Sequence, residues 1–281
     1  MRTAGRVWLI TGAGRGLGRA FVDAALAAGD RVLATTRAPG PLDEIAAVRP
    51  EALVVRTLDV RDRAAGRAAV AAAVEHFGRL DVLVNNAGYG LAGAIEEVSE
   101  QELRDLIDTN LLGTVWMTQA ALTQMRTQGH GDIVQISTVG GVGTVPLLGA
   151  YNASKWALEG YSEALAAEVA GFGIRVTIAE LGGFDTDWGG ASMRFATPAT
   201  AYDPVREQVF GTATVPWPAV DGNESQGSTP DLAAAALLRH LDDEDPPLRL
   251  LVGDDAPDHV RMAMERRRDD YARDERFRWP T

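Results

Sequence analysis

The sequence predicts an α/β protein in which a doubly wound parallel sheet is flanked by helices. Three observations support this prediction: apolar runs of strand length alternate with helical segments, a glycine-rich turn joins the first such pair, and polar residues follow several strands. Repeated strand–helix units give a parallel sheet that helices cover on both faces. A chain of 281 residues with 46% hydrophobic residues can bury a full core. Because no linker interrupts the pattern, we expect a single domain over residues 1–281.

The expected strands and helices alternate along most of the chain. The strands are expected at Val7–Ile10, Arg31–Thr35, Leu53–Leu58, Val82–Val84 and Ile133–Ile136. The helices between and after them are expected at Ala20–Ala28, Ala64–Phe77, Glu100–Met125 and Ala153–Val169. A last helix, Asp231–Leu241, and a last strand, Leu248–Val252, complete the pattern.

The segment 187–230 has no such periodicity. It is rich in Gly, Pro and Thr, and its aromatic residues are scattered: Trp188, Phe195, Tyr202, Phe210 and Trp217. An irregular insert of this length in a compact fold is usually a functional lid or a binding loop. We therefore expect a substrate-binding lid, with the alternative that the aromatic residues only anchor the loop to the core.

The composition argues against several other classes of protein. The chain has no cysteine and four scattered histidines, so we expect no disulfide scaffold and no metal. A net charge of −12 argues against a nucleic-acid partner. No long apolar run occurs, and no charged-then-apolar leader precedes Val7, so we expect a cytoplasmic protein without a membrane partner. The tail from Arg261 to Arg278 balances its arginines with acidic residues and is expected to be a solvated helix.

A glycine-rich turn, Thr11-Gly12-Ala13-Gly14-Arg15-Gly16-Leu17-Gly18, separates the first strand from the first helix. Glycines let a backbone approach a phosphate, and a helix N-terminus offers N–H groups and the positive end of its dipole. We therefore expect Gly12, Gly16 and Leu17 to bind a dinucleotide in a Rossmann-like fold. The spacing is not the usual G-x-G-x-x-G, and the alternative is a purely structural turn.

The residues near the end of the second strand indicate which dinucleotide binds. An acidic residue there would accept from the free 2′-hydroxyl of NAD, and this chain has none. Instead Arg37 follows the strand and Arg15 lies in the glycine turn, so two guanidinium groups could bind one phosphate. This pattern predicts NADP(H), unless both are ordinary surface arginines in an Arg-rich protein.

Small and polar residues follow the next strands. Asp59-Val60 comes after the third strand, and Asn85-Asn86-Ala87-Gly88 comes after the fourth. Ligands bind at the carboxyl ends of strands in such folds. We expect Asp59 to accept from an adenine amino group, and the Ala87-Gly88 turn to let backbone lie against a ribose.

One short stretch carries the reactive chemistry. The 27 Lys and Arg residues include a single lysine, Lys155, four residues after Tyr151. Arginine cannot give up its proton, so a position that keeps lysine in an arginine-rich chain needs a compact, tunable ammonium. In a helix, residues four apart share a face, so phenol and ammonium would point into the same space. The alternative is a solvated lysine beside a packed tyrosine.

Together these motifs resemble the classical short-chain dehydrogenase/reductase family, over about Val7 to Thr186. The glycine turn resembles the family's cofactor loop, Asp59-Val60 its adenine contact, and Asn85 to Gly88 its Asn-Asn-Ala-Gly signature. Asn110 falls where the family has its catalytic asparagine, and Tyr151 with Lys155 falls on its Tyr-x-x-x-Lys pair. The resemblance implies a small-molecule carbonyl or alcohol substrate, NADP(H) and a homodimer or homotetramer.

Two positions depart from the family pattern. The family's catalytic serine precedes the tyrosine by thirteen residues, and Thr138 stands there, with Ser137 just before it. Threonine keeps the hydroxyl, so we assign the role to Thr138 and keep Ser137 as the alternative. The usual Pro-Gly turn reads Leu181-Gly182-Gly183-Phe184-Asp185-Thr186. The resemblance implies that Phe184 and Thr186 contact the cofactor, although the proline is absent.

The expected reaction is hydride transfer between NADP(H) and a carbonyl or carbinol carbon. Tyr151 is the expected general acid or base, and Lys155 is expected to favour its phenolate and to hold the ribose. Thr138 is expected to donate to the substrate oxygen, and Asn110 to order a water beside Lys155. An epimerase, a dehydratase or another non-reductive enzyme remains the alternative, and a non-catalytic dinucleotide sensor is a further one.

Overall fold

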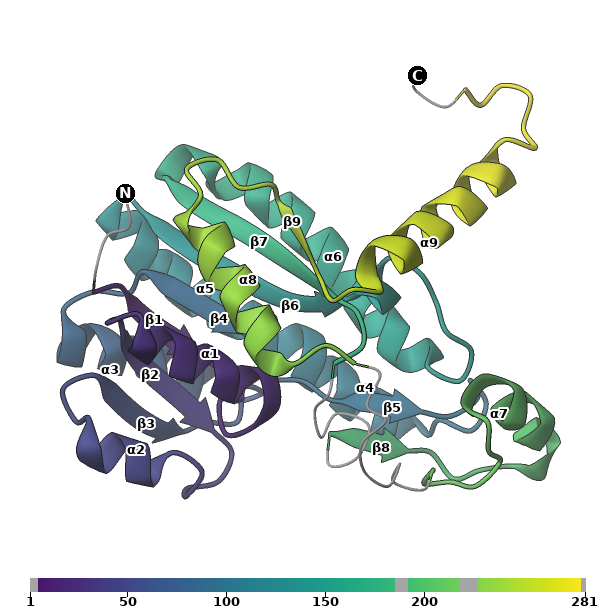
Figure 1. Ribbon diagram of the computed structural model, residues 1–281, viewed down its shortest axis with the longest axis horizontal. Coiled ribbons are helices and arrows are strands. Elements are labelled where there is room, and N and C mark those ends of the chain that lie inside the picture. Colours follow the sequence, from purple (N-terminus) through teal and green to yellow (C-terminus); the bar gives the residue numbers. More distant parts are fainter. Residues whose placement is uncertain (1–4, 185–191, 218–226, 279–281) are drawn as a thin grey trace.

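The computed structural model describes residues 5–184, 192–217 and 227–278, and it has the predicted α/β architecture. Seven parallel strands form the main sheet in the order β3-β2-β1-β4-β6-β7-β9 (Figure 1). Their bounds are β1 Val7–Ile10, β2 Arg31–Thr36, β3 Leu53–Thr57, β4 Val82–Asn85, β6 Gly131–Thr138, β7 Ile174–Leu181 and β9 Arg249–Val252. The order reverses between β1 and β4, where doubly wound sheets bind ligands.

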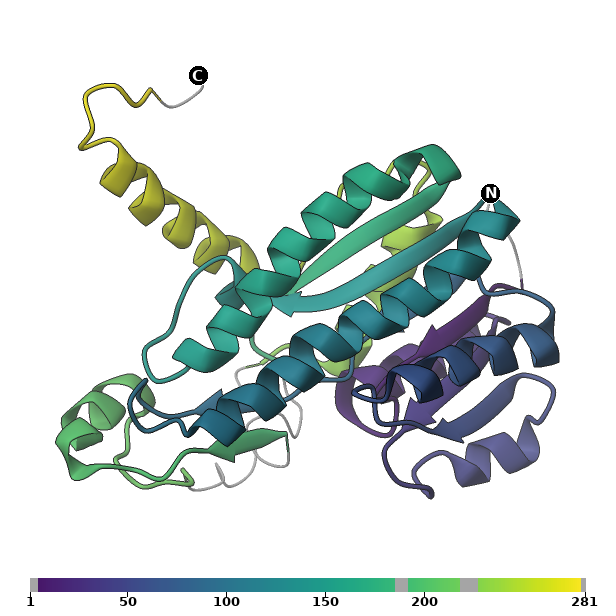
Figure 2. The same cartoon turned by 180° about the vertical axis from the view of Figure 1, so that it is seen from behind.

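Helices cover both faces of this sheet. Helices α1 (Gly16–Ala27) and α8 (Pro230–Asp242) pack together on one face (Figure 1). Helices α3 (Arg63–Phe77), α5 (Gly113–Gln128) and α6 (Gly149–Val169) lie across the other face (Figure 2). Each face has its own buried apolar cluster, with Phe21 and Leu237 in the first and Met117 and Leu165 in the second. Burial of both faces explains why the strands read as continuous apolar runs.

The predicted helix over Glu100–Met125 was wrong in one respect, because it is not uniform. Helix α4 (Glu100–Ile107) passes into a π-helical turn over Asp108–Leu112, and α5 continues from Gly113. A π-turn adds one residue to a helical turn, and a periodic pattern over some twenty residues does not reveal it. The inserted turn contains Asn110, whose side chain is buried.

The segment 187–230 is also not wholly irregular, contrary to the prediction. It contains β8 (Met193–Phe195) and α7 (Asp203–Phe210). Strand β8 pairs in parallel with β5 (Gly90–Ala92), and the two form a small separate sheet (Figure 1). Strands of three residues are too short to show alternation, so neither was predictable. The helix α2 (Asp43–Val48) was also missed, because six residues are too few to show a helical period.

The C-terminal helix α9 (Ala256–Tyr271) projects from the body of the molecule (Figures 1 and 2). Of its residues only Ala256 is buried, which agrees with the predicted solvated helix. It is nevertheless attached near its middle, where the Arg267 guanidinium lies 4.5 Å from the ring centre of Trp156. In the described ranges, no helix has the length and apolar character needed to cross a bilayer.

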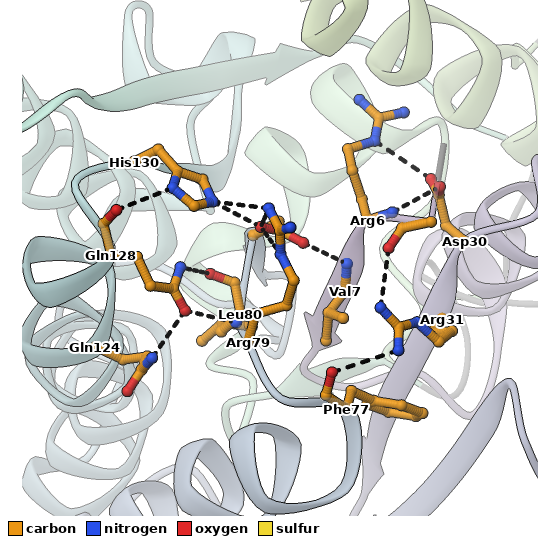
Figure 3. A network of polar contacts seen from close by, with 12 residues as sticks. Arg6, Val7, Asp30, Arg31, Phe77, Arg79, Leu80, Gln124, Gln128 and His130 are labelled. Carbon is orange, nitrogen blue, oxygen red and sulfur yellow. Dashed lines mark hydrogen bonds and ion pairs between the residues drawn. The ribbon is translucent and has the colours of Figure 1, made fainter. Parts of the chain in front are cut away.

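Two buried carboxylates, Asp30 and Asp81, lie directly before β2 and β4, in a polar network that Figure 3 shows. Asp30 accepts from the Arg6 amide and the Trp8 indole, at 3.1 and 3.0 Å. Asp81 accepts from the Val7 amide at 2.8 Å and lies 2.9 Å from His130 Nε2. Buried polar groups in folded proteins are usually hydrogen-bonded in this way. We therefore assign this network to the sheet's stability.

Candidate active site

A cavity of about 690 Å³ lies at the carboxyl ends of the strands. Its walls come from the glycine turn, from the residues that follow β2, β3 and β4, and from the ends of β6, β7 and α6. Most of the predicted site residues line it: Gly12, Arg15, Gly16, Leu17, Arg37, Asp59, Val60, Asn86, Ala87, Gly88, Thr138, Tyr151, Lys155 and Phe184. Thr186 lies outside the described residues, and Asn110 lies behind the wall.

The glycine turn forms a close-fitting cradle at one end of the cavity. Gly12 and Gly16 adopt φ values of 64° and 51°, which favour glycine. A Cβ atom on Gly12 would lie 2.9 Å from the Ala87 Cα atom, and one on Gly18 would meet the Gly12 carbonyl oxygen. Helix α1 begins at Gly16 without a side-chain cap, so its first N–H groups remain for a ligand. These features suit the pyrophosphate of a dinucleotide.

The side chain of Asn86 holds the glycine turn in place through hydrogen bonds. Its side-chain amide donates to the carbonyl oxygens of Thr11 and Gly12, at 3.0 and 3.1 Å. The Thr11 hydroxyl accepts in return from the backbone N–H groups of Asn86 and Ala87, both at 3.0 Å. The turn after β4 is thereby locked to the glycine turn. Asn86 lines the cavity, but its amide is already engaged in this lock.

The arginines of the cavity divide into two groups. Arg37 is exposed after β2, and Arg15 donates from the glycine turn to Ser192 Oγ at 2.8 Å. Arg61 instead binds Asp59 through its Nη2 and Nε atoms, at 2.6 and 3.0 Å. The hydrogen bond from Arg61 holds the pKa of the Asp59 carboxyl below its usual value. Asp59 thus remains an acceptor, although Arg61 occupies much of its capacity.

The reacting end of the cavity contains Tyr151 and Lys155 in the first turns of α6. The helix begins at Gly149, four residues before the predicted start, so the tyrosine lies inside it. Lys155 Nζ is 5.9 Å from the Tyr151 ring centre and donates to the Ile136 carbonyl at 2.7 Å. Burial lowers the pKa of Lys155 to about 8. The two side chains share one space, as predicted from their spacing.

The surroundings of Tyr151 act on the pKa of its phenol in opposite directions. Burial raises the pKa of its phenol above the ordinary value, and the opposing influence is a hydrogen bond with Thr138 and not the Lys155 ammonium. The expectation assumed that the ammonium outweighs burial, and in this structure it is bonded to backbone instead. The phenol therefore keeps its proton at neutral pH. This state suits a proton donor.

The neighbouring hydroxyls Ser137 and Thr138 have different partners. Thr138 lies within hydrogen-bonding reach of Tyr151 and donates to the Leu181 carbonyl at 3.0 Å. Ser137 is 2% exposed and donates to Glu159 Oε1 at 2.5 Å. Of the two, Thr138 is the hydroxyl beside the phenol.

Asn110 contacts the site through the backbone of Tyr89. Its Oδ1 accepts from the Tyr89 N–H at 3.0 Å, and its Nδ2 donates to the Tyr89 carbonyl at 2.9 Å and to Ser154 Oγ at 3.2 Å. Both amide protons are thus engaged, while Oδ1 keeps a second lone pair. The π-turn places this side chain against the cavity wall.

The turn after β7 is built without the proline that the family usually has. A Cβ atom on Gly182 would overlap the Asp255 carboxylate, which accepts from the Gly183 N–H at 3.0 Å. Asp255 therefore holds a turn that proline would otherwise stiffen. Phe184 follows and lines the cavity.

Several cavity residues were missed at the sequence level, among them Arg61, Tyr89, Ser192 and Arg194. Arg194 lies 4.3 Å from the ring centre of Tyr89, and both belong to the small sheet or border it. The pairing of β5 with β8 brings Tyr89, Ser192 and Arg194 to the cavity, and no local sequence pattern predicts that pairing. In the part of the chain described here, no group of three His, Asp or Glu side chains is arranged to hold a metal.

The parallel sheet, the glycine cradle and the buried Tyr–Lys pair define an oxidoreductase of the dinucleotide-binding α/β class. The family is shown by a match to the model for short chain dehydrogenases over residues 6–194. The chain belongs to the short-chain dehydrogenase/reductase family.

Sequence similarity to known proteins covers nearly the whole chain. Oxidoreductase BOA17 of Botryotinia fuckeliana (strain B05.10) is 40% identical over 264 residues, which cover 92% of this chain and 93% of that protein. The 3-ketodihydrosphingosine reductase of Bacteroides thetaiotaomicron is 37% identical over 88% of both chains. A crystal structure of a short-chain dehydrogenase from Streptomyces avermitilis is 40% identical, has a TM-score of 0.85 and covers 98% of this chain and 97% of its own.

Proposed function

We propose that this oxidoreductase reduces a ketone or an aldehyde with NADPH, and that Tyr151 is the general acid. The observation that carries the proposal is the buried Tyr151 phenol beside the Thr138 hydroxyl and Lys155, in a cavity that also contains the glycine cradle. A protonated phenol can give its proton to the alkoxide that forms when hydride adds to a carbonyl, because the alkoxide is the stronger base. The reverse oxidation would need the phenolate, which burial disfavours.

The residues present fit a dinucleotide. The cradle would be filled by a side chain at Gly12 or Gly18, so it leaves room for phosphate close to backbone. Gly12, Gly16 and Leu17 would bind the pyrophosphate, Arg15 and Arg37 the 2′-phosphate, and Asp59 and Val60 the adenine. Asn86, Ala87, Gly88, Phe184 and Thr186 would contact the remainder. The bound nicotinamide supplies the hydride.

The side chains at the reacting end then have distinct roles in the reduction. Tyr151 gives its proton to the substrate oxygen as negative charge develops there. Thr138 turns its hydroxyl from the Leu181 carbonyl to the same oxygen and stabilises that charge. Lys155 holds the ribose and presents its ammonium close to the phenol, where a positive charge favours proton release. Asn110 orders a water through the free lone pair of its Oδ1.

The name of one relative suggests the kind of carbonyl compound. The Bacteroides thetaiotaomicron protein is a 3-ketodihydrosphingosine reductase, and it matches this chain over 88% of its length. That protein reduces a ketone, so ketones take first place among the candidate substrates. We expect the segment 187–230 to determine the size and polarity of the substrate that is accepted. This is the segment that we expect to act as a substrate-binding lid.

The test is a substrate screen of the purified protein with NADPH and, separately, NADH. The panel contains 3-keto lipids, 3-ketoacyl thioesters, simple ketones, aldehydes and ketoses. The proposal predicts oxidation of one NADPH for each molecule of alcohol formed. Conversion of a substrate without net loss of NADPH would instead identify an epimerase, a dehydratase or another non-reductive enzyme.

We further propose a homodimer or homotetramer of single-domain chains in the cytoplasm. Members of the family are expected to associate in this way, and the chain's exposed Trp156 and Leu103 offer apolar contact area. Sedimentation equilibrium of the purified protein measures the state directly, and a monomer at micromolar concentration would contradict the association.

A further inference from the structure

A cluster of charged side chains, of which Glu159 and Glu180 are buried, lies beside the Tyr151–Lys155 pair and has no task in the reaction proposed above. Glu159 accepts from the Ser137 hydroxyl at 2.5 Å, and its other oxygen lies 3.4 Å from Arg249 Nη2. Arg249 Nε lies 2.8 Å from Glu180 Oε1, and Arg249 also pairs with Glu163. Glu159 and Glu180 are 7% and 0% exposed. Three carboxylates therefore share one guanidinium, and we call these residues with Ser137 the carboxylate cluster.

Helix α6 connects this cluster to the reacting end. Lys155 and Glu159 are four residues apart on α6, so they lie on one face of the helix, and both are buried. Lys155 donates to the Ile136 carbonyl, and Glu159 accepts from the next residue, Ser137. The ammonium and the carboxylate thus bond to consecutive residues at the end of β6. Thr138 is the residue that follows them.

The ammonium of Lys155 needs a source of negative charge. Burial lowers the pKa of Lys155, and the opposing influence is the charge of Glu159. A backbone carbonyl, the other partner of Nζ, is a neutral acceptor. Without Glu159 the buried side chain would lose its proton more readily, because desolvation disfavours the charged form.

The surroundings of Glu159 act on the pKa of its carboxyl in opposite directions. Burial raises the pKa of Glu159, while the Ser137 hydrogen bond and the Arg249 charge oppose that effect. The other charged groups that face the pair are Glu163 on α6, Glu180 on β7 and Arg249 on β9. Burial raises the pKa of Glu180 to about 7, so Glu180 is only partly ionised at neutral pH. Glu159 is the carboxylate closest in sequence to Lys155 on the shared helix face.

We propose that Glu159 is a positioning residue of the active site whose carboxylate keeps Lys155 in the ammonium form. The inference rests on the proposed function, because the ammonium matters for the reduction. It adds to that function a residue outside the Tyr–Lys pair, the hydroxyl and the asparagine.

The single lysine of the chain allows a direct test. Protein labelled with 15N-lysine gives one side-chain signal, that of Lys155. Its chemical shift, followed by NMR from pH 6 to pH 11, gives the titration midpoint without substrate or cofactor. The variants are Glu159→Gln, which keeps the size and an acceptor for Ser137, and Glu163→Gln as the matched control. Glu163 lies one helical turn further on, contacts the same Arg249 and has a side chain 55% exposed.

Glu159→Gln should lower the midpoint by on the order of one pH unit, the size expected for one close opposite charge. Glu163→Gln should move it far less. With an identified substrate, the alkaline decline of kcat/KM should move to lower pH by the same amount in Glu159→Gln. An unchanged midpoint, or an equal shift in both variants, would overturn the proposal, and so would a lower rate with an unshifted pH profile.

A second variant covers the case in which Glu159→Gln does not fold. Glu159→Asp keeps the charge and withdraws it by one methylene, so its midpoint should lie below that of wild type. A midpoint equal to that of wild type in a folded Glu159→Asp that has lost the bond to Ser137 would overturn the proposal. Because the titration needs no turnover, a failed substrate screen would reject the proposed function, and the midpoints would still decide the role of Glu159.

Discussion

At the scale of single residues, the end of β6 separates two adjacent hydroxyls that are chemically alike. Ser137 faces Glu159, and Thr138 faces the Tyr151 phenol. Side chains alternate along a strand, so neighbours must point to opposite sides. This alternation gives each hydroxyl a separate role.

The first prediction distinguishes these hydroxyls. Thr138→Ala should lower kcat by roughly 10² or more, the usual cost of losing one donor to a developing oxyanion. Thr138→Ser should keep most of the activity, because the hydroxyl stays. Ser137→Ala should cost less than Thr138→Ala, since Ser137 acts only through Glu159. Steady-state kinetics of the three variants decide the assignment, and a larger loss in Ser137→Ala would transfer the donor role to Ser137.

The second prediction concerns Glu180 and the pH dependence of stability. Burial raises the pKa of Glu180 from 4.5 to about 7. A group whose pKa is raised by folding contributes stability that is complete below 4.5 and is lost as the pH rises through 7. Glu180→Gln cannot ionise, so its Tm should fall less between pH 4.5 and pH 8 than that of wild type. Differential scanning calorimetry of wild type, Glu180→Gln and the control Glu163→Gln measures the Tm at both pH values. An equal fall in Tm in all three proteins would contradict the prediction.

Single residues were predictable where chemistry restricts the choice. The lone lysine, the glycines of the turn and the absence of an acidic residue after β2 are visible in the sequence because few other residues would serve. The Arg61–Asp59 pair and the Asp255 contact to Gly183 were not visible. A surface arginine and a surface aspartate have many possible partners, and only the fold selects one.

At the scale of elements, two irregular features shape the cavity wall. The π-turn over Asp108–Leu112 presents Asn110 to the Tyr89 backbone, and the pairing of β5 with β8 brings Arg194 over the Tyr89 ring. Neither follows from periodicity, since one depends on a single inserted residue and the other on contact between distant segments. The long strands and helices were predictable because burial of a face imposes a regular pattern.

The third prediction tests how the described part of the insert is anchored. The Arg206 side chain is 4% exposed and pairs with Glu97, whose side chain is 2% exposed. Glu97 also accepts from the backbone N–H groups of Ala94 and Ala199. Glu97→Ala leaves the buried Arg206 with the partly exposed Asp203 as its ion-pair partner and should lower the free energy of unfolding by about 3 kcal/mol. Urea denaturation measures this free energy, and Glu96→Ala, at the exposed neighbouring position, is the control. Equal losses of unfolding free energy in the two variants would contradict the anchoring role.

At the scale of the whole molecule, the charge balance opposes an anionic cofactor. With a net charge of −12, the protein repels a dinucleotide unless local cations receive its phosphates. Arg15, Arg37, Arg61 and Arg194 line the cavity and supply such cations. The net negative charge could be predicted from the composition. The clustering of four arginines around the cavity could not, because it depends on how the chain folds.

The fourth prediction concerns the choice between the two dinucleotides. Arg37→Ala should weaken NADPH binding roughly 10- to 100-fold, the loss of one charge-assisted hydrogen bond, and should barely change NADH binding. Arg15→Ala should be less selective, because Arg15 also holds Ser192. Calorimetric titration of both nucleotides gives the affinities. Equal affinity of wild type for NADH and NADPH would contradict the assignment of the 2′-phosphate site.

The whole account depends on proton donation by Tyr151 during hydride transfer. The most direct measurement uses NADPH that carries deuterium at both C4 positions and the best ketone from the screen, with wild type, Tyr151→Phe and Lys155→Arg. Wild type should place one deuterium on the carbinol carbon for each NADPH oxidised. Both variants should lose roughly 10² or more in kcat, the usual contribution of a positioned acid. Product that carries no deuterium, or a Tyr151→Phe enzyme with a near wild-type rate, would contradict the account.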